Sequence, residues 1–480
     1  MTSFGKTLQT HATPIPGLTV WDLPVHGDNR GWFKETWQRE KMAAAGLPHF
    51  VPVQNNVSFN DSVGTTRGIH AEPWDKFVSV ATGRVFGAWV DLREGPNFGA
   101  VFTAHLDPSR AVFVPRGVGN GFQTLEPNTA YIYLVNDHYS PSAMYTSLNL
   151  ADETAAIDWP IPLDKATLSA KDREHPRLRD VKPSPPRKVL VVGAGGQLGR
   201  ALRTTYRDAE GVEFAERADI DLLTADLESA RDWRSYEAII NAAAYTQVDS
   251  AETPIGRVTA WNTNVRGVAK LACIATNYDI KLVHISSDYV FDGAKSRAYL
   301  EDDDFCPLGV YGQTKAAADQ LVKMVPRHYI LRTSWVVGDG SNFVRTMIGL
   351  AKRDISPSVV DDQRGRLTFT TQLVDGIRHL LDSEAPSGTY NVSSSGDSTS
   401  WAEVARRVFA LAGRDPSYVT GVSTAAYTSM RPGPYAPRPA NSVLDLSKIV
   451  STGFNPAPSD ELLRAYIRNA QTLGDDATDR

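Results

Sequence analysis

Apolar residues follow two different patterns along the 480-residue chain. Over residues 18–150 they form short runs divided by turn residues, as at 77–80, 85–92 and 111–115. Only residues 38–45 in this part have the spacing of a helix. Regularly spaced short strands favour an antiparallel sandwich or barrel. The pattern therefore predicts an all-β first domain.

In the second half, apolar runs alternate with longer helical stretches. Runs at 189–192, 238–241 and 281–285 lack polar alternation, which indicates strands buried on both faces. Helical spacing is found at 262–277 and 314–325. This alternation predicts an α/β domain with a doubly wound parallel sheet of the Rossmann type.

The segment 179–187, RDVKPSPPR, separates the two patterns. Its prolines keep the backbone extended, so we interpret it as a stiff linker. We therefore predict one domain over residues 1–183 and a second over 187–480. Beyond about Gly338 the second domain should supply most of a smaller substrate-binding lobe.

Composition limits the kinds of partner and compartment. The formal net charge of −5 gives no reason to expect nucleic acid or an anionic membrane surface. No apolar run reaches the length of a membrane span, and residues 1–18 lack the apolar centre of a secretion signal. Two cysteines, Cys273 and Cys306, cannot form a disulfide framework or a zinc site on their own. We expect a cytoplasmic protein, and we assign no metal ligands.

Residues 187–200, RKVLVVGAGGQLGR, combine a strand, a glycine-rich turn and the start of a helix. Glycine at positions Gly193, Gly196 and Gly199 permits a tight turn, a close approach by a pyrophosphate, and close strand–helix packing. Free N–H groups at the start of the helix suit phosphate. A βα turn without a ligand is the alternative, but strand and helix on either side favour a dinucleotide site.

Tyr311 and Lys315 lie four residues apart at the start of a predicted helix, so they share one face. An ammonium beside a phenol favours the phenolate, which would lower the pKa of the tyrosine. Such a tyrosine can pass a proton to a carbonyl oxygen as a hydride arrives. Ser287, just past a buried strand, could hydrogen-bond the same oxygen. The pair alone also occurs on ordinary helix surfaces, but behind a glycine loop it indicates hydride transfer.

In the first half, polar groups recur beside aromatic residues. They include clusters at 30–35, 54–56, 67–70 and 168–172. Each residue taken singly is better explained as a structural or surface residue. Taken in order, the clusters resemble the cupin-fold dTDP-4-dehydrorhamnose 3,5-epimerases over about residues 14–180.

This resemblance implies acid–base chemistry beside a ketone. Epimerisation needs a base on one face of the sugar, an acid on the other, and a cation for the enolate oxygen. A histidine titrates near neutral pH, which suits the base. By the resemblance, the base is His70, Asp172 fixes its tautomer, Tyr133 returns the proton and Lys76 stabilises the enolate.

The same resemblance implies the substrate contacts. Arg30 and Arg67 suit the nucleotide pyrophosphate, because arginine binds phosphate in a bidentate way. Tyr139 would stack on the thymine. The residues that would hold the sugar or the base are Glu35, Gln54 and Asn56.

Three features depart from the epimerase pattern. Asn120 stands where the family has histidine before Gly-Phe, Met144 replaces a substrate-binding glutamate, and the loop between His70 and Lys76 is short. Asn120 can still contact the substrate through a hydrogen bond, but it carries no charge near neutral pH. These changes leave open whether both C3 and C5 are epimerised.

The second half resembles the extended short-chain dehydrogenases, and within them the dTDP-4-dehydrorhamnose reductases, over about residues 187–475. The segments that carry the likeness are 241–252, 286–293, 332–335, 360–363 and 438–442. By this likeness Asp288 and Trp335 touch the sugar, and Arg438 holds the substrate pyrophosphate or forms a surface salt bridge. The implied cofactor contacts are Gly193, Gly196, Gln197, Leu198, Gly199, Asp221, Leu222, Ala244, Tyr245, Thr246, Tyr311 and Lys315.

Together the two resemblances imply consecutive enzymes in one chain. The first would epimerise dTDP-4-dehydro-6-deoxy-D-glucose, and the second would reduce the resulting dTDP-4-dehydro-L-rhamnose with NADPH, or NADH. The alternatives are a related deoxysugar enzyme with single-site epimerisation, and a non-catalytic nucleotide-sugar-binding regulator. A requirement for Mg²⁺ stays open. The epimerase resemblance implies a homodimer through the first domain.

Overall fold

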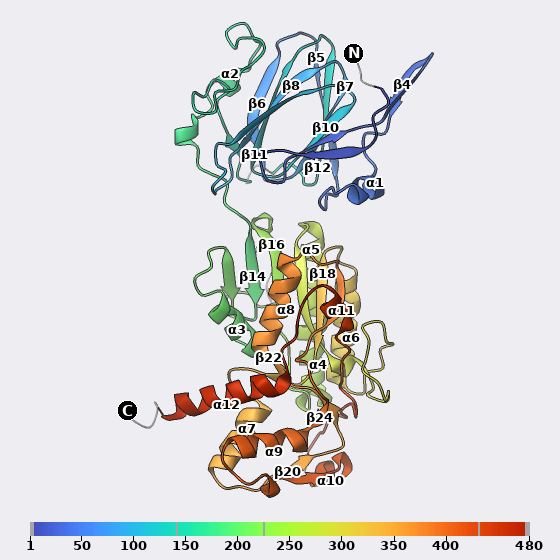
Figure 1. Cartoon of the computed structure of the whole chain (residues 1–480), viewed down its shortest axis with the longest axis vertical. Helices are drawn as coiled ribbons and strands as arrows, with labels where there is room; N and C mark the ends of the chain where they lie inside the picture. The colour runs from blue at the N-terminus through green and yellow to red at the C-terminus, as the bar shows by residue number, and fades with distance from the viewer. Residues whose placement is uncertain (1–3, 141–142, 224–225, 431–432, 476–480) are drawn as a thin grey trace. The chain divides into compact units, whose positions relative to one another are not determined.

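The computed structural model describes residues 4–140, 143–223, 226–430 and 433–475. Contacts within the chain divide it into two compact units, Met1–Pro186 and Arg187–Arg480 (Figure 1). The outer ends of the predicted domains, residues 1 and 480, lie outside the described residues. No helix in the described part of the chain is both long and apolar enough to cross a bilayer.

The first unit is built from two antiparallel sheets (Figure 1), as the all-β prediction requires. One sheet has the order β1 (Gln9–Ala12), β2 (Thr19–Asp22), β10 (Arg110–Val114), β7 (Lys76–Thr82), β12 (Thr129–Val135) and β5 (Gln54–Asn60). The other has the order β13 (Thr146–Ser147), β6 (Thr66–Ala71), β11 (Val118–Thr124), β8 (Val85–Asp91) and β9 (Val101–Leu106). The remaining elements are the hairpin β3 (Val25–Asp28) and β4 (Gly31–Lys34), with helices α1 (Arg39–Ala44) and α2 (Ala170–Arg173).

The central strands of this sandwich are buried on both faces. Val78, Val112 and Trp89 fill the space between the sheets. The outer face of one sheet is covered by α1 through Met42, and that of the other by the segment after β13 through Trp159. Strands β7 and β8 are therefore buried along almost their whole length, because both of their faces are covered.

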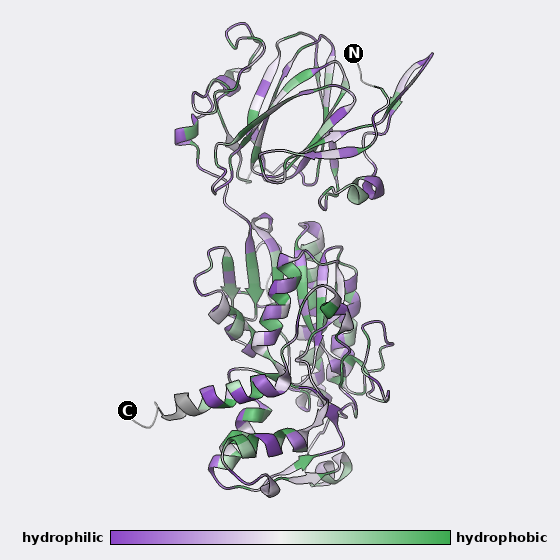
Figure 2. Ribbon diagram, in the orientation of Figure 1, coloured by the Kyte–Doolittle hydropathy of each residue, from purple (hydrophilic) through white to green (hydrophobic). Residues whose placement is uncertain are grey.

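The second unit has a six-stranded parallel sheet with helices on both faces, which confirms the doubly wound expectation. The strand order is β15 (Val212–Ala215), β14 (Lys188–Val192), β16 (Tyr236–Asn241), β17 (Lys281–Ser287), β18 (His328–Thr333) and β23 (Gly388–Asn391). One face is covered by α5 (Gly267–Asn277) and α6 (Val310–Lys323), the other by α3 (Gln197–Thr205), α8 (Thr370–Asp382) and α11 (Ser447–Ser451). Figure 2 shows these strands as largely hydrophobic and the helices as two-sided.

A smaller lobe with its own core lies beside the sheet (Figure 1). Its elements are β19 (Val336–Val337), α7 (Phe343–Lys352), β20 (Ser358–Val360), β21 (Arg364–Gly365), β22 (Thr368–Phe369), β24 (Thr399–Ser400), α9 (Trp401–Leu411), β25 (Thr420–Val422), α10 (Thr424–Ser429) and α12 (Ser459–Asp475). Residues beyond Gly338 do supply most of it. However, α8 and β23 return to the main sheet: α8 packs on one of its faces, and β23 pairs with β18 at its edge.

Local details differ from the sequence-based expectation. The helical stretch 262–277 begins with a π-helical turn, Asn262–Arg266, after helix α4 (Pro254–Trp261). Helix α6 begins at Val310, four residues earlier than predicted, because Glu252 Oε1 accepts a hydrogen bond from the Val310 N–H at 2.8 Å. A carboxylate at this end also complements the helix dipole.

The proline-rich segment is not a free linker throughout. The Ser184 N–H donates to the Leu92 carbonyl at 2.8 Å, and the Glu94 N–H donates to the Ser184 carbonyl at 2.8 Å. The prolines around Ser184 have no N–H, but Ser184 keeps one and pairs like a short strand. The first unit therefore reaches Pro186 by its contacts, three residues past the predicted boundary.

Candidate active sites

A cavity of about 370 Å³ lies in the first unit, lined by strands of both sheets and by α2. Its walls bring together six of the predicted epimerase residues. They are Arg67, His70, Lys76, Asn120, Tyr133 and Asp172.

His70 and Asp172 meet in this cavity although 102 residues separate them. His70 Nε2 lies 3.0 Å from Asp172 Oδ1, with the His70 side chain 40% exposed and Asp172 only 7% exposed. Asp172 sits in the first turn of α2, where its N–H donates to Ser169 Oγ at 3.0 Å. This cap holds the carboxylate against the imidazole, the arrangement that orients a general base.

Lys76 forms a buried ion pair with Glu72, four residues before it. The Lys76 ammonium also lies 5.7 Å from the centre of the Tyr133 ring. Burial raises the pKa of Tyr133, and the Glu72 carboxylate raises it further, while Arg67 opposes both. Tyr133 therefore stays protonated at neutral pH and can donate a proton.

Asn120 faces the same cavity, where its Oδ1 accepts a hydrogen bond from the Tyr131 hydroxyl at 3.1 Å. The Tyr131 ring stacks on Phe122 with centroids 4.1 Å apart and forms the apolar floor. Because the Asn120 oxygen is already engaged, its amide N–H₂ is the group left to face a ligand.

The other predicted substrate residues do not line this cavity in the described part of the chain. Arg30 is exposed at the tip of the β3–β4 hairpin and bonds to Asp28. Glu35 pairs with Lys41 at 2.8 Å near α1. The remaining predicted residues lie elsewhere on the surface or on β5: Gln54 donates to Asn56 at 2.7 Å, and Tyr139 is 71% exposed. Their roles stay predictions.

A second cavity, of about 400 Å³, lies at the carboxyl ends of β14, β15 and β16. Gly193 has a φ of +82°, and a Cβ there would stand 2.6 Å from the Ala243 nitrogen. A Cβ at Gly199 would stand 2.5 Å from Ala194, so only glycine allows α3 to approach the turn this closely. The N-terminus of α3 has no side-chain cap, which leaves its N–H groups for an anion.

Several predicted cofactor residues line this second cavity. They are Gly193, Gly196, Asp221, Leu222, Ala244 and Tyr245. Gln197 instead donates to the Ser341 carbonyl at 3.2 Å, and the Leu198 side chain packs in the core under the sheet. Thr246 is outside the cavity lining among the described residues.

Ser287, Tyr311 and Lys315 converge next to this cavity. Ser287 ends β17, whereas Tyr311 and Lys315 occupy successive turns of α6. Tyr311 lies within hydrogen-bonding reach of Ser287, and its ring packs in the same cluster as Tyr245 from the cavity wall. The arrangement places the Ser287 and Tyr311 hydroxyl groups together beside the second cavity.

The expected lowering of the Tyr311 pKa is wrong for this structure. Burial raises the pKa of Tyr311 to about 12, and the nearby Asp288 carboxyl adds to the rise. Lys315 does not reach the phenol, because its Nζ donates to the Ile285 carbonyl at 2.6 Å and lies 3.3 Å from His284 Nε2. Burial lowers the pKa of Lys315 to about 8. Tyr311 is therefore a protonated acid rather than a phenolate.

The three predicted substrate contacts of the second unit differ in burial and in the residues that they contact. Asp288 is buried beside Ser287, which donates to its Oδ1 at 3.1 Å, and burial raises the pKa of Asp288 to about 7. Trp335 is half-buried and stacks on Trp401 with centroids 3.7 Å apart. Arg438 forms an ion pair with Asp249, so the salt-bridge alternative describes its contact here.

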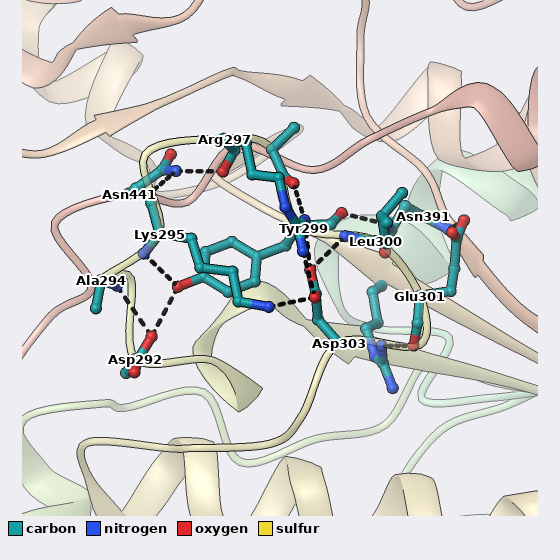
Figure 3. A network of polar contacts seen from close by, with 12 residues as sticks. Asp292, Ala294, Lys295, Arg297, Tyr299, Leu300, Glu301, Asp303, Asn391 and Asn441 are labelled. Atoms are coloured by element: carbon teal, nitrogen blue, oxygen red, sulfur yellow. Dashed lines mark hydrogen bonds and ion pairs between the residues drawn. The ribbon is translucent and has the colours of Figure 1, made fainter.

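A polar network fixes the segment that follows Asp288 (Figure 3). Asp303 is its centre: it accepts from Arg297 at 2.7 and 2.8 Å, from the Leu300 N–H at 2.8 Å, and from Lys295. The Tyr299 hydroxyl donates to Asp292 Oδ1 at 2.7 Å. These bonds connect the segment 292–303, which follows Asp288 in the chain.

Sequence reasoning missed several residues beside the cavities, and three of them bear on the chemistry. Glu72 lines the first cavity, and its spacing of two from His70 and four from Lys76 could have suggested it. Glu216 lines the second cavity at the end of β15. His175 lies beside His70, and burial lowers its pKa, with the His70 charge acting in the same direction. Its position three residues after Asp172 was the only local indication.

Comparisons with known proteins divide the chain at the same place. The family model described as dTDP-4-dehydrorhamnose 3,5-epimerase matches residues 12–180, and the model described as RmlD substrate binding domain matches residues 187–472. The second match covers more than half of the chain. The two cavities therefore lie in two different family domains.

Individual relatives agree with this division. A protein named RmlC homolog from Streptococcus pyogenes serotype M6 is 51% identical over 182 residues, 36% of this chain and 91% of its own. A dTDP-4-dehydrorhamnose reductase from Aggregatibacter actinomycetemcomitans is 38% identical over 58% of this chain and 99% of its own. The structure of the Bacillus anthracis dTDP-4-dehydrorhamnose reductase with NADP is 32% identical, with a TM-score of 0.53 over 59% of this chain and 99% of its own. The chain therefore belongs to the RmlD-type dTDP-4-dehydrorhamnose reductases and carries, ahead of that domain, a dTDP-4-dehydrorhamnose 3,5-epimerase domain.

Proposed function

We propose that the chain converts dTDP-4-dehydro-6-deoxy-D-glucose into dTDP-L-rhamnose, with the two steps performed by the residues at its two cavities. The observation that carries this proposal is that each cavity has proton-transfer groups at its edge. His70, Lys76 and Tyr133 surround the first, and Ser287 and Tyr311 adjoin the second.

In the first cavity, His70 removes the proton from the carbon beside the ketone. Asp172, 3.0 Å from His70 Nε2, stabilises the imidazolium that forms. Lys76 faces the enolate oxygen and neutralises its developing charge. Tyr133, kept protonated by burial, returns a proton on the opposite face.

In the second cavity, Tyr311 supplies the proton of the reduction. Its pKa of about 12 keeps it protonated at neutral pH, so it can protonate the carbonyl oxygen that becomes an alcohol. Ser287 donates a hydrogen bond to the same oxygen. A bound nicotinamide cofactor supplies the hydride.

We propose NADPH as that cofactor. The Bacillus anthracis relative was solved with NADP, and the glycine turn here leaves no room for a Cβ at Gly193 or Gly199. The open N–H groups of α3 suit the pyrophosphate. For Mg²⁺, the described residues of the second unit offer no group of three or more clustered His, Cys, Asp or Glu side chains.

We propose that the chain acts as a homodimer through the first domain. Edge strand β5 exposes Val57 (64%) and Phe59 (56%), and the β3–β4 hairpin exposes Phe33 (68%). An exposed apolar edge strand is a template for pairing with another chain. Arg30 on the same hairpin would then face the partner's cavity, which accounts for its distance from its own.

Product identification tests the proposed function. The chain with dTDP-4-dehydro-6-deoxy-D-glucose and NADPH should yield dTDP-L-rhamnose with one NADPH consumed for each sugar. A different epimer would support the single-site alternative. No oxidation of NADPH, with substrate still bound, would support the regulator alternative.

Asn120 and Met144 bear on the single-site alternative. Asn120 lacks the charge of the family histidine. We therefore expect the cavity to bind the sugar more weakly between the two inversions. Exchange at C3 should then be slower than exchange at C5. Incubation in D₂O without NADPH, read by NMR at both carbons, measures this. Equal rates at both positions would show that the two departures are neutral.

We also propose that the two units are separate enzymatic domains. Fragments 1–186 and 187–480, expressed apart, should each fold and should rebuild the pathway when mixed. Two insoluble fragments would refute this division.

A further inference from the structure

His175 is a buried histidine that the proposed epimerase chemistry does not use. Its side chain is 6% exposed, and the polar groups beside its ring are the Leu148 carbonyl and, 3.8 Å from Nε2, Asp172 Oδ1. Nε2 forms no hydrogen bond of normal length with a described residue, and an unpaired buried nitrogen is costly. The ring lies against His70, with centroids 5.1 Å apart at an angle of 65°.

The His175 nitrogen points to the catalytic pair. His175 Nε2 is 3.8 Å from Asp172 Oδ1, and His70 Nε2 is 3.0 Å from the same oxygen. One ligand atom from each of the three residues lies within 4.8 Å of the others. Two ligands of a tetrahedral zinc ion, at about 2.0–2.2 Å from the metal, are about 3.4 Å apart. The observed separations lie on either side of that value.

The surroundings suit a metal site that is open on one side. The Leu148 carbonyl lies beside His175, where it can orient the ring nitrogen that does not face Asp172. His70 is 40% exposed to the cavity, which leaves room for a water molecule as a fourth ligand. Two imidazoles and one carboxylate favour zinc, cobalt or nickel over magnesium. Lys171 also lines the cavity and opposes a cation, so moderate affinity is expected.

We propose that His70, Asp172 and His175 form a binding site for one divalent transition-metal ion, and that an ion bound there blocks the epimerase. The metal takes His70 Nε2 in place of the proton that pairs with Asp172, so the ring proton moves to Nδ1, the nitrogen that would accept the proton from the substrate. The ion and its bound water also occupy the cavity side of His70, so metal and substrate exclude one another in the first cavity. Binding itself does not depend on the proposed function, whereas the block does.

Cobalt(II) is a suitable probe, because its visible absorption reports tetrahedral coordination. The untagged full chain, freed of metal with EDTA, is dialysed against CoCl₂ and its cobalt content is measured. We expect about one ion per chain, with His175→Gln losing it. His26→Gln, at an exposed position on β3, is the matched control and should keep it. Equal binding by the His175→Gln chain, or no binding by the wild type, would overturn the proposal.

Inhibition is measured on the same preparations with ZnCl₂. Zinc should stop deuterium uptake in the wild type and leave NADPH oxidation with dTDP-4-dehydro-L-rhamnose unchanged. The His175→Gln chain should be at least about tenfold less sensitive. If that variant fails to fold, displacement of cobalt by dTDP-4-dehydro-6-deoxy-D-glucose in the wild type decides the question. Cobalt absorption that the substrate does not alter would refute a site on the base. If the chain binds cobalt but shows no deuterium uptake even when free of metal, the proposed epimerase activity is refuted and the metal site is not.

Discussion

Glu72 and Lys76 form a buried ion pair inside the first cavity, with side chains 18% and 6% exposed. The pair holds the ammonium that we propose as the partner of the enolate oxygen. It also places a negative charge near Tyr133, the proposed acid.

Glu72→Gln should therefore change the pH dependence of epimerisation. Burial raises the pKa of Tyr133 and Glu72 raises it further, so removing the carboxylate charge lowers that pKa. Because the acid must be protonated, the alkaline limb of the rate profile should move to lower pH. Deuterium exchange from pH 6 to 11 measures it, with the exposed Glu94→Gln as control. If the alkaline limb does not move, the Glu72 charge does not affect the pKa of the catalytic acid.

Tyr311→Phe should lower NADPH oxidation on dTDP-4-dehydro-L-rhamnose by roughly 10²-fold or more, which is the scale of general acid catalysis. Epimerisation should be unchanged, because its residues lie in the other unit. Tyr278→Phe is a matched control, since that hydroxyl contacts Glu228 on the surface. A near-normal reductase rate in the Tyr311 variant would remove Tyr311 from the mechanism.

Asp288→Asn should stabilise the protein increasingly as the pH rises. A carboxyl in the unfolded chain titrates near 3.8, whereas burial raises the pKa of Asp288 to about 7. Between these values the folded state holds a proton that the unfolded state has lost, so wild-type stability falls with rising pH. The variant cannot titrate there, and its advantage should grow by on the order of 2–3 kcal/mol from pH 5 to pH 7. Urea unfolding at both pH values measures this, and a constant difference would contradict it.

Asp319→Asn should destabilise the second unit by about 3–5 kcal/mol, because it leaves a buried charge unpaired. Asp319 Oδ2 accepts from Arg332 Nε at 2.9 Å, and both side chains are fully buried. Asp339→Asn is the control: that carboxylate is 69% exposed and should cost less than about 1 kcal/mol. Denaturant unfolding of both variants compares them, and equal losses would mean that the buried pair contributes little.

Features encoded in neighbouring residues could be predicted from the sequence alone. Strand periodicity, the glycine turn at Gly193 and the four-residue spacing of Tyr311 and Lys315 depend on local backbone geometry. A short segment specifies that geometry by itself, and the structure contains these elements close to their expected places. The order of the residue clusters along the chain, through its resemblance to known families, also predicted an epimerase and a reductase.

Other features required the folded chain. Asp172 reaches His70 across 102 residues, and His175 joins them only because α2 packs against β6. Ser184 bonds to Leu92 and Glu94, so part of the expected linker is attached to the first unit by an isolated β-bridge. Contacts of this kind depend on where distant segments meet, which residue spacing does not contain.

The pKa of Tyr311 shows most clearly the difference between what the sequence determines and what the folded chain decides. The sequence determined that Lys315 lies one helical turn away, and from this alone a lowered pKa was expected. The tertiary structure decided the opposite direction, because Lys315 bonds to the Ile285 carbonyl and the phenol is buried. Helical spacing brings two residues to one face, but desolvation and hydrogen-bond partners come from the strands packed against that face.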